Sequence, residues 1–299
     1  MNIRQLRYFL ALSEDLHFKR ASERLFIVQP ALSKQIAALE KEMGVQLFIR
    51  NKRNVQLSEA GAYLKQHGRT LLEQFEKIKN ETVLVALGEK GEIRIGYVGS
   101  CIHTFLPKIL AELHKTFPQI QTYLSEMNSA AQIEAIQKGL LDIAFLRNPP
   151  QTLPWQNKLV FRESFSLVLP VGHPLHAENF VGVSQLAHEW FILPTKKDGI
   201  LYHQLQWSIC EDAGFTPKIA HETVHGYTTL NLVENGLGVS FLPTSFKNVS
   251  HAAVKFIELQ TLPQKAEITA IWDAENPNPA LRKFLHFVNP EPYLPSEKS

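Results

Sequence analysis

The residues of this chain best suited to chemistry lie between positions 16 and 60. Two short stretches with apolar residues at helical spacing flank a tight turn, and the second opens with Gln29, Pro30, Ser33 and Lys34. Amide, hydroxyl and ammonium groups at the tip of a helix can bond to base edges and phosphates. The pattern predicts a helix-turn-helix whose second helix enters the major groove of double-stranded DNA.

Three helices are expected to share the core that holds this tip. Their inward faces are Ile3, Leu6, Phe9 and Leu10, then Phe18, Ala21, Ser22 and Leu25, then Leu32, Ile36, Leu39 and Met43. Pro30 suits the first helical position, where its missing N–H is not needed, and Gly44 favours a stop. The expected DNA contacts on these helices are Phe18, Lys19, Gln29, Pro30, Ser33 and Lys34.

A β-hairpin wing is predicted next. Val45, Leu47 and Ile49 alternate, as do Val55 and Leu57, around a cationic stretch. Arg50, Lys52 and Arg53 would follow phosphates or enter a narrow minor groove. A solvated hairpin is the alternative, but the position beside a recognition helix favours DNA contact.

The charge distribution agrees with a DNA-facing N-terminus. Residues 1–88 carry 14 Lys and Arg against 9 Asp and Glu, and residues 89–299 carry 17 against 20. The net charge of +2 therefore divides into +5 and −3. A basic N-terminal part fits a phosphate-binding surface.

A long helix is predicted after Ser58, which can cap its start. Its apolar seam steps by four and three residues, through Leu64, Gly68, Leu71, Phe75, Ile78, Thr82 and Val85. Such a heptad pattern favours self-association, with Leu64, Leu71, Phe75 and Ile78 at the interface. The alternative is a helix packed on its own domain.

The remainder of the chain predicts two successive α/β units with a cleft between them. Strands at residues 92–98, 120–124 and 141–146 alternate with helices at 105–117 and 129–139, which implies a parallel sheet covered on both faces. The alternation restarts with strands near 165–169, 190–193, 218–220 and 239–242 and helices near 199–213 and 227–235. A strand at 267–272 and a helix at 279–288 end the fold.

Ligands of such sheets bind at the carboxyl ends of strands. Ser100 and Cys101 follow the first strand, Ser129 opens the second helix, and Arg147 follows the third strand. The two serines could bond a carboxylate or only cap helices. Arg147 could be a fixed charge for an acid or an ion pair that braces the lobes.

Other classes of protein are disfavoured. No nucleophile elbow, phosphate loop or Rossmann glycine pattern occurs, so neither an enzyme nor a cofactor is expected. Cys101 and Cys210 could form a redox pair, but no neighbouring residue argues for a reactive thiol. The chain has no apolar signal core and no apolar run of about 18 residues, so we expect no membrane contact and a cytoplasmic protein.

The chain resembles the LysR-type transcriptional regulators. The segments that carry the resemblance are residues 4–9 (RQLRYF), 21–25 (ASERL), 29–36 (QPALSKQI), 39–48 (LEKEMGVQLF), 57–61 (LSEAG), 139–144 (GLLDIA), 172–175 (GHPL) and 236–243 (GLGVSFLP). The resemblance implies a multidomain α+β protein. It would have a winged helix-turn-helix over residues 1–58, a dimerising linker helix over 59–88 and an effector-binding domain over 89–299. This last domain would resemble periplasmic binding proteins, with one lobe at about 92–163 and 266–299 and the other at about 164–265.

The resemblance also implies how the protein works. It would be a homotetramer, built as a dimer of dimers, that activates or represses a promoter together with RNA polymerase and answers to a small inducer. The stretch 95–100 (IGYVGS) is most similar to regulators that respond to aromatic compounds or small organic acids. By position, Ser100, Ser129, Thr195, Tyr202 and His225 would line the pocket, with Cys101 and Arg147 beside them. A redox-sensing regulator and a solute-binding module without regulatory DNA binding remain the alternatives.

Overall fold

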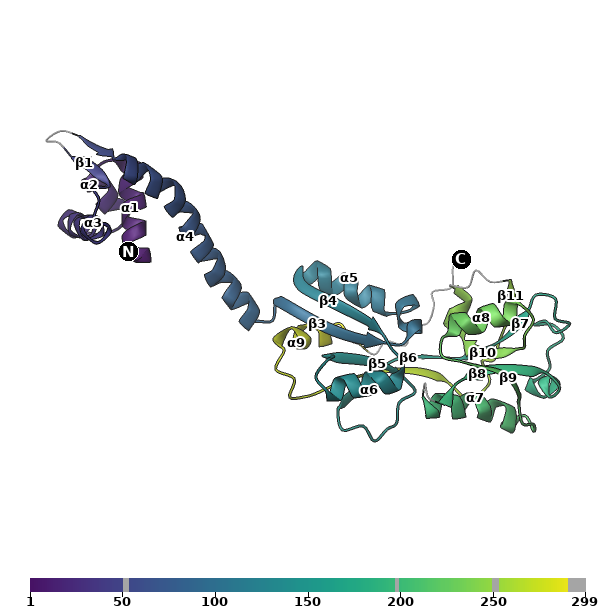
Figure 1. Ribbon diagram of the computed structural model, residues 1–299. Helices are drawn as coiled ribbons and strands as arrows, with labels where there is room; N and C mark the ends of the chain where they lie inside the picture. Colours follow the sequence, from purple (N-terminus) through teal and green to yellow (C-terminus); the bar gives the residue numbers. More distant parts are fainter. Residues whose placement is uncertain (51–53, 197–198, 249–252, 290–299) are drawn as a thin grey trace. The chain divides into compact units, whose positions relative to one another are not determined.

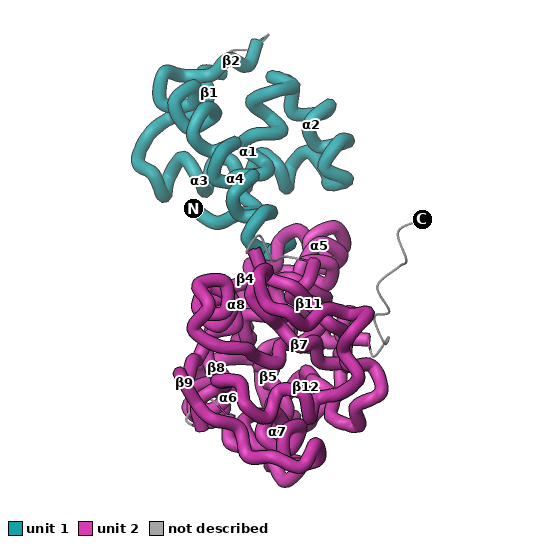
Figure 2. The backbone as a smooth tube through the Cα atoms, turned by 90° about the vertical axis from the view of Figure 1, so that its right-hand side faces the viewer, with its two compact units in different colours: residues 1–84 teal, residues 85–299 magenta. Residues whose placement is uncertain are grey.

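The computed structural model describes residues 1–50, 54–196, 199–248 and 253–289 (Figure 1). It forms two compact units, Met1–Leu84 and Val85–Ser299, which Figure 2 shows in two colours. Unit 1 contains α1 (Ile3–Asp15), α2 (Phe18–Arg24), α3 (Gln29–Met43), β1 (Phe48–Arg50), β2 (Val55–Leu57) and most of α4 (Glu59–Ala86). This order is that of a winged helix-turn-helix followed by a long helix.

The three expected helices share one core, as the apolar periodicity predicts. Its buried members are Leu6, Phe9, Leu10, Leu12, Ala21, Leu32, Ile36, Leu39, Leu47 and Phe48. The side chain of Met43 was expected in this core and is instead exposed. Gly44 ends α3 in the left-handed conformation at φ +71°, so Met43 lies on the last turn beyond the packed face.

The wing is a two-stranded antiparallel hairpin in which Phe48 pairs with Leu57 and Arg50 with Val55. Its first strand begins at Phe48, and Val45, expected in that strand, is exposed just after the end of α3. Lys52 and Arg53, expected at the tip, lie outside the described residues.

The linker helix α4 begins as expected, because the N–H of Gly61 donates to Ser58 Oγ at 2.9 Å. Its first turns pack on unit 1: Leu64 and Leu72 touch the core, and Gly68 is buried against Leu6. Leu64 was expected at the interface between chains, but it packs within unit 1, as in the alternative of a helix packed on its own domain. Leu71, Phe75 and Ile78 are 45%, 40% and 64% exposed.

In unit 2, one lobe is built on a five-stranded sheet, and we call it lobe I. Its strands are β3 (Lys90–Tyr97), β4 (Gln119–Glu126), β5 (Ile143–Arg147), β6 (Gln156–Glu163) and β12 (Ala266–Trp272), in the order β4-β3-β5-β12-β6. The expectation of a parallel sheet is correct for β3, β4 and β5. The complete sheet is mixed, because β12, whose direction was not predicted, runs antiparallel to β5 and β6.

Helices cover both faces of this sheet. Residues of α5 (Leu106–Thr116) and α9 (Pro279–Leu285) share a core with Ile143 and Phe145 of β5, whereas α6 (Ser129–Gln137) packs with Ala144 and Leu146. Alternate residues of β5 thus point to opposite faces, and all five are buried. A short 3-10 helix, η1 (Gly99–His103), joins β3 to α5.

The other lobe, lobe II, holds the remaining elements. Strand β7 (Phe165–Pro170) lies between β10 (Ser240–Pro243) and β11 (Val254–Glu258), antiparallel to both. Strands β8 (Trp190–Pro194) and β9 (Lys218–Thr223) are parallel, and α7 (Ile200–Asp212), α8 (Gly226–Glu234), η2 (Val183–Leu186) and η4 (Thr244–Asn248) complete the lobe. The chain crosses between the lobes from β6 to β7 and again from β11 to β12.

None of the helices in the described ranges has the length and apolar character needed to cross a membrane. Within the same ranges, no group of three or more His, Cys, Asp or Glu side chains is arranged to hold a metal ion.

The two cysteines lie in separate cores. Cys101 belongs to the core of lobe I and Cys210 to that of lobe II, and each is completely buried. Burial raises the pKa of both thiols to about 12. This environment disfavours the redox alternative, because the thiolate is the reactive form.

We therefore predict that both thiols are unreactive in the native chain. At pH 8, a pKa of about 12 leaves roughly one thiol in ten thousand ionised. Ellman's reagent should titrate both thiols in denaturant and neither, on the scale of minutes, in buffer. Rapid native labelling, or an intramolecular disulfide after peroxide treatment, would contradict this expectation.

Candidate DNA interface and ligand pocket

The tip of α3 presents the polar side chains expected there. Gln29, Pro30 and Lys34 are exposed, and Ser33 is partly buried. Lys19 is exposed on α2. Val28 precedes the helix as its N-terminal cap and offers no side-chain hydrogen bond, so the first turn has no capping side chain at this position.

An exposed apolar residue beside this tip was missed by the sequence reasoning. Phe26 lies in the turn before α3 with its side chain 96% exposed and φ at +54°. The sequence pattern predicted only that Phe26 lies in the turn. A bulky residue in the left-handed region of backbone conformation is uncommon. Its position next to a polar tip was the signal that could have identified it.

Two of the expected DNA contacts are also committed to interactions within unit 1. Arg50 donates to Glu40 Oε2 at 2.7 Å, and its guanidinium carbon lies 5.1 Å from the centroid of the Phe18 ring. Glu40 Oε1 accepts the backbone N–H groups of Leu47 and Phe48 at 2.9 and 3.0 Å. Arg50 and Phe18 therefore fix the wing against α3.

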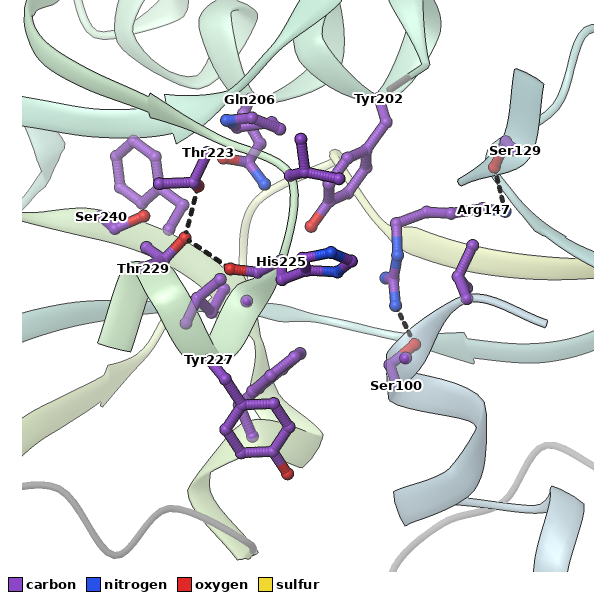
Figure 3. A pocket seen from close by; sticks show the side chains of 18 of the residues that line it. Ser100, Ser129, Arg147, Tyr202, Gln206, Thr223, His225, Tyr227, Thr229 and Ser240 are labelled. Atoms are coloured by element: carbon purple, nitrogen blue, oxygen red, sulfur yellow. Dashed lines mark hydrogen bonds between the residues drawn. The ribbon is translucent and has the colours of Figure 1, made fainter. Parts of the chain in front are cut away.

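A cavity of about 80 Å³ lies between lobes I and II. Figure 3 shows its polar lining. Lobe I contributes residues at the carboxyl ends of its parallel strands, as expected, and lobe II contributes α7, α8 and strand ends. The polar residues are Ser100, Glu126, Ser129, Arg147, Tyr202, Gln206, Thr223, His225, Tyr227, Thr229 and Ser240.

Arg147 supplies the fixed charge of this cavity. Its side chain is 9% exposed, its backbone N–H donates to Ser129 Oγ at 3.1 Å, and its Nη2 donates to Ser100 Oγ. The guanidinium carbon lies 5.0 Å from the centroid of the Tyr202 ring. Among the described residues, Nη1 has no hydrogen-bond partner and the side chain has no ion pair within 4.0 Å. A buried guanidinium with a spare donor is suited to a carboxylate.

Glu163 is the acid whose charge is coupled to Arg147. Burial raises the pKa of Glu163, while the charge of Arg147 and bonds from Ser245 lower it. The carboxylate accepts the N–H of Ser245 at 2.6 Å and its hydroxyl at 2.9 Å. These bonds hold Glu163 at the crossing between the lobes.

On the lobe II side of the cavity, Tyr202 and His225 were expected and line it, whereas Gln206, Thr223, Thr229 and Ser240 were not identified from the sequence. The hydroxyls of Thr223 and Thr229 lie 2.7 Å apart, and Ser240 Oγ donates to the backbone oxygen of Ile192 at 2.7 Å. Gln206 is completely buried on α7, one turn beyond Tyr202. That spacing puts both side chains on one helix face and was the available signal for Gln206.

Polar contacts between the lobes stand at the mouth of the cavity. His103 Nε2 of lobe I lies 2.7 Å from the hydroxyl of Tyr227 of lobe II, and Glu126 Oε1 lies 3.7 Å from His225 Nδ1. Burial lowers the pKa of His103, and the charge of Glu126 partly offsets this. Side chains of the two lobes thus meet beside the cavity.

Two residues expected in the pocket do not line it. Cys101 follows Ser100 on η1, and in a helix of three residues per turn the two side chains point about 120° apart, so that of Cys101 enters the core of lobe I. Thr195 follows β8, where its N–H donates to the backbone oxygen of Thr223 at 3.0 Å. Ser100, Ser129, Arg147, Tyr202 and His225 are brought together.

Comparison with known proteins covers nearly the whole chain. Residues 3–62 match the model of the bacterial regulatory helix-turn-helix proteins of the lysR family, and residues 86–291 match the LysR substrate binding domain. The HTH-type transcriptional regulator AlsR of Bacillus subtilis (strain 168) is 35% identical over 97% of this chain and 96% of its own length. The Hca operon transcriptional activator HcaR of Escherichia coli (strain K12) is 32% identical over 96% of this chain and 97% of its own.

Solved structures agree with this assignment. The crystal structure of CbnR, a LysR family transcriptional regulator, matches with a TM-score of 0.83 and 25% identity over 97% of this chain and 100% of that one. Full-length CbnR in complex with its target DNA matches with the same score and identity, over 96% of this chain and 98% of that one. With a matching DNA-binding model, a matching ligand-domain model and full-length relatives, the chain belongs to the LysR family of DNA-binding transcriptional regulators and carries an effector-binding domain.

Proposed function

We propose that this regulator is controlled by a small organic acid bound between lobes I and II. The observation that carries the proposal is Arg147, a buried cation at the cavity whose Nη1 has no partner among the described residues. An unpaired buried charge is costly, and a carboxylate would relieve that cost through short, charge-assisted bonds. Ser100 and Ser129 stand beside Arg147 and would complete the carboxylate site.

The size of the cavity favours a short-chain acid over an aromatic one. Its volume is about 80 Å³. An apolar cavity that accommodates benzene is about 150 Å³, roughly twice as large. Between the two classes expected from the sequence, the small organic acid is therefore the one we propose.

Control would operate through the orientation of the lobes. Arg147 and Ser100 belong to lobe I, whereas Tyr202 and His225 belong to lobe II, so one ligand would touch both. A ligand shifts such an equilibrium only by the difference in its affinity for the two arrangements. An acid that bridges the lobes would favour the closed arrangement.

The DNA contacts and the assembly remain part of the proposal. We assign Lys19, Gln29, Pro30, Ser33 and Lys34 to the operator surface, with Phe18 and Arg50 holding the wing in position beside it. The division of the chain is into residues 1–58, 59–88 and 89–299, and the exposed face of α4 would pair two chains within a dimer of dimers. RNA polymerase would be the further partner at the promoter.

Replacing Arg147 with methionine should abolish stabilisation by acids. A ligand at 100 times its Kd raises the free energy of unfolding by about 2.7 kcal/mol, and we expect acetate, propionate or butyrate to act in this way on the wild type. Thermal unfolding of the full chain across a panel of aromatic and short-chain acids measures the effect. Ser100→Ala and Ser129→Leu should also reduce it.

Arg162→Met is the matched control, since Arg162 is an exposed arginine of β6 paired with Glu267 outside the cavity. Its response to acids should equal that of the wild type. An undiminished response in Arg147→Met, or none in the wild type with any acid, would refute the proposed site.

The α3 tip should govern operator recognition. Gln29→Ala and Ser33→Ala should each reduce discrimination between operator and scrambled DNA by about 1–3 kcal/mol where a bidentate base contact is lost. Lys34→Ala should weaken binding to both duplexes and lower the salt dependence by about one ion. Lys41→Ala, near the far end of the same helix, is the control. Fluorescence anisotropy with an operator selected from random sequence measures this, and unaltered preference in the double variant of Gln29 and Ser33 would count against α3.

Charges on the exposed face of α4 should dissociate the assembly. Leu71→Glu with Ile78→Glu places two carboxylates in the apolar seam, and sedimentation should then show a smaller species with weaker operator binding. Gln66→Glu with Asn80→Glu adds the same charges to exposed positions on the opposite face. If the seam variant sediments like this control, α4 does not pair chains.

A further inference from the structure

Two buried polar atoms without partners line the pocket, and they are of opposite kinds. Among the described residues, the unsatisfied atoms at the cavity are Nη1 of Arg147, a donor, and Oε1 of Gln206, an acceptor. Gln206 is 1% exposed and Arg147 is 9% exposed, so both are nearly shielded from bulk water. Buried polar groups are nearly always hydrogen-bonded, so such a pair requires an explanation.

Both side chains line the same cavity of about 80 Å³, so one small molecule in it can reach both. Tyr202, whose ring lies beside the Arg147 guanidinium, and Gln206 are four residues apart on α7. Residues at this spacing share a helix face and are about 6 Å apart along the axis. Figure 3 shows Gln206 and Tyr202 on one side of the pocket and Arg147 with Ser100 on the other.

The acceptor specifies what the ligand carries besides its carboxylate. The neighbouring hydroxyls are already engaged, Thr223 with Thr229 and Ser240 with the backbone of Ile192. Gln206 Oε1 therefore needs a donor from the ligand. An ammonium group would bring three donors to this one unsatisfied acceptor, a keto group would bring none, and a hydroxyl brings one.

We propose that the ligand of this regulator is a short-chain hydroxycarboxylic acid, with its carboxylate on Arg147 and its hydroxyl donating to Gln206. This inference rests on the proposed function, because it assumes that Arg147 binds a carboxylate. It adds that Gln206 distinguishes a hydroxy acid from the corresponding acid without the hydroxyl.

The test uses two matched series on the full chain, measured by isothermal titration calorimetry. One is lactate, propionate and pyruvate, and the other is 3-hydroxybutyrate, butyrate and acetoacetate. An acceptor left unsatisfied in the pocket costs enough that, in at least one series, the hydroxy acid should bind roughly tenfold to hundredfold more tightly than the other two acids. In Gln206→Met this preference should disappear, while Gln204→Met, an exposed position of the same helix, should keep it.

The outcomes separate the inference from the proposed function. If acids bind through Arg147 with no preference for the hydroxyl, the proposed function stands and the inference fails. A preference for the keto acids would mean that the amide presents its donor, which also overturns the inference. If none of the six acids binds, the inference is overturned together with the short-chain acid proposed above. If the preference for the hydroxy acid persists in Gln206→Met, another residue recognises the hydroxyl, and the role of Gln206 is overturned.

Discussion

The ligand-binding half of the molecule is organised around one buried positive charge. Arg147 ends β5, the strand whose five residues are all buried, and its guanidinium is therefore held between the lobes. Two serines and a tyrosine ring partly satisfy it, and the parallel strands bring those serines to the same sheet edge. A buried cation is unfavourable unless its hydrogen bonds are satisfied, and Nη1 of Arg147 has no partner among the described residues.

The linker helix serves two different partners along its length. Its first turns complete the core of unit 1, where Gly68 brings the helix backbone close to Leu6. Beyond that point the apolar side chains of Leu71, Phe75 and Ile78 are exposed. The heptad pattern therefore covers a first part that packs within the chain and a second part whose apolar side chains are exposed and available for pairing. The sequence does not distinguish the two parts, because packing within a chain and pairing between chains need the same apolar spacing.

Periodicity predicted the parts of the fold whose apolar residues are strongly patterned. The three N-terminal helices and the alternation from β3 to β5 follow directly from it. Strands β6 and β11 were missed because their sequences, QNKLVFRE and VKFIE, are mixed, with several charged positions. The direction of β12 was not predictable either, since an apolar strand can pair in either sense.

The residues of the candidate site also fall into a group that the sequence could predict and a group that it could not. The lobe I residues Ser100, Ser129 and Arg147 follow predicted strand ends, which is a rule that sequence can apply. Gln206, Thr223 and Thr229 meet them only because the two lobes close on each other, and that long-range juxtaposition has no local signature. Cys101 and Thr195 were wrong for the pocket because adjacent side chains on a short helix or strand end point in different directions.

The carboxylate of Glu40 gives the DNA-binding unit a fixed internal geometry. A hairpin with strands of three residues has little stability or orientation of its own. Glu40 of α3 accepts hydrogen bonds from the backbone of the wing and from the side chain of Arg50. These bonds fix the position of the wing relative to α3. The distance between the stretches of duplex that the wing and α3 would meet is then set by the protein. If those stretches lie at another spacing in a given sequence, the DNA would have to bend or twist to reach both elements. Selectivity would then also depend on how stiff the base steps between them are, although the protein does not touch those steps.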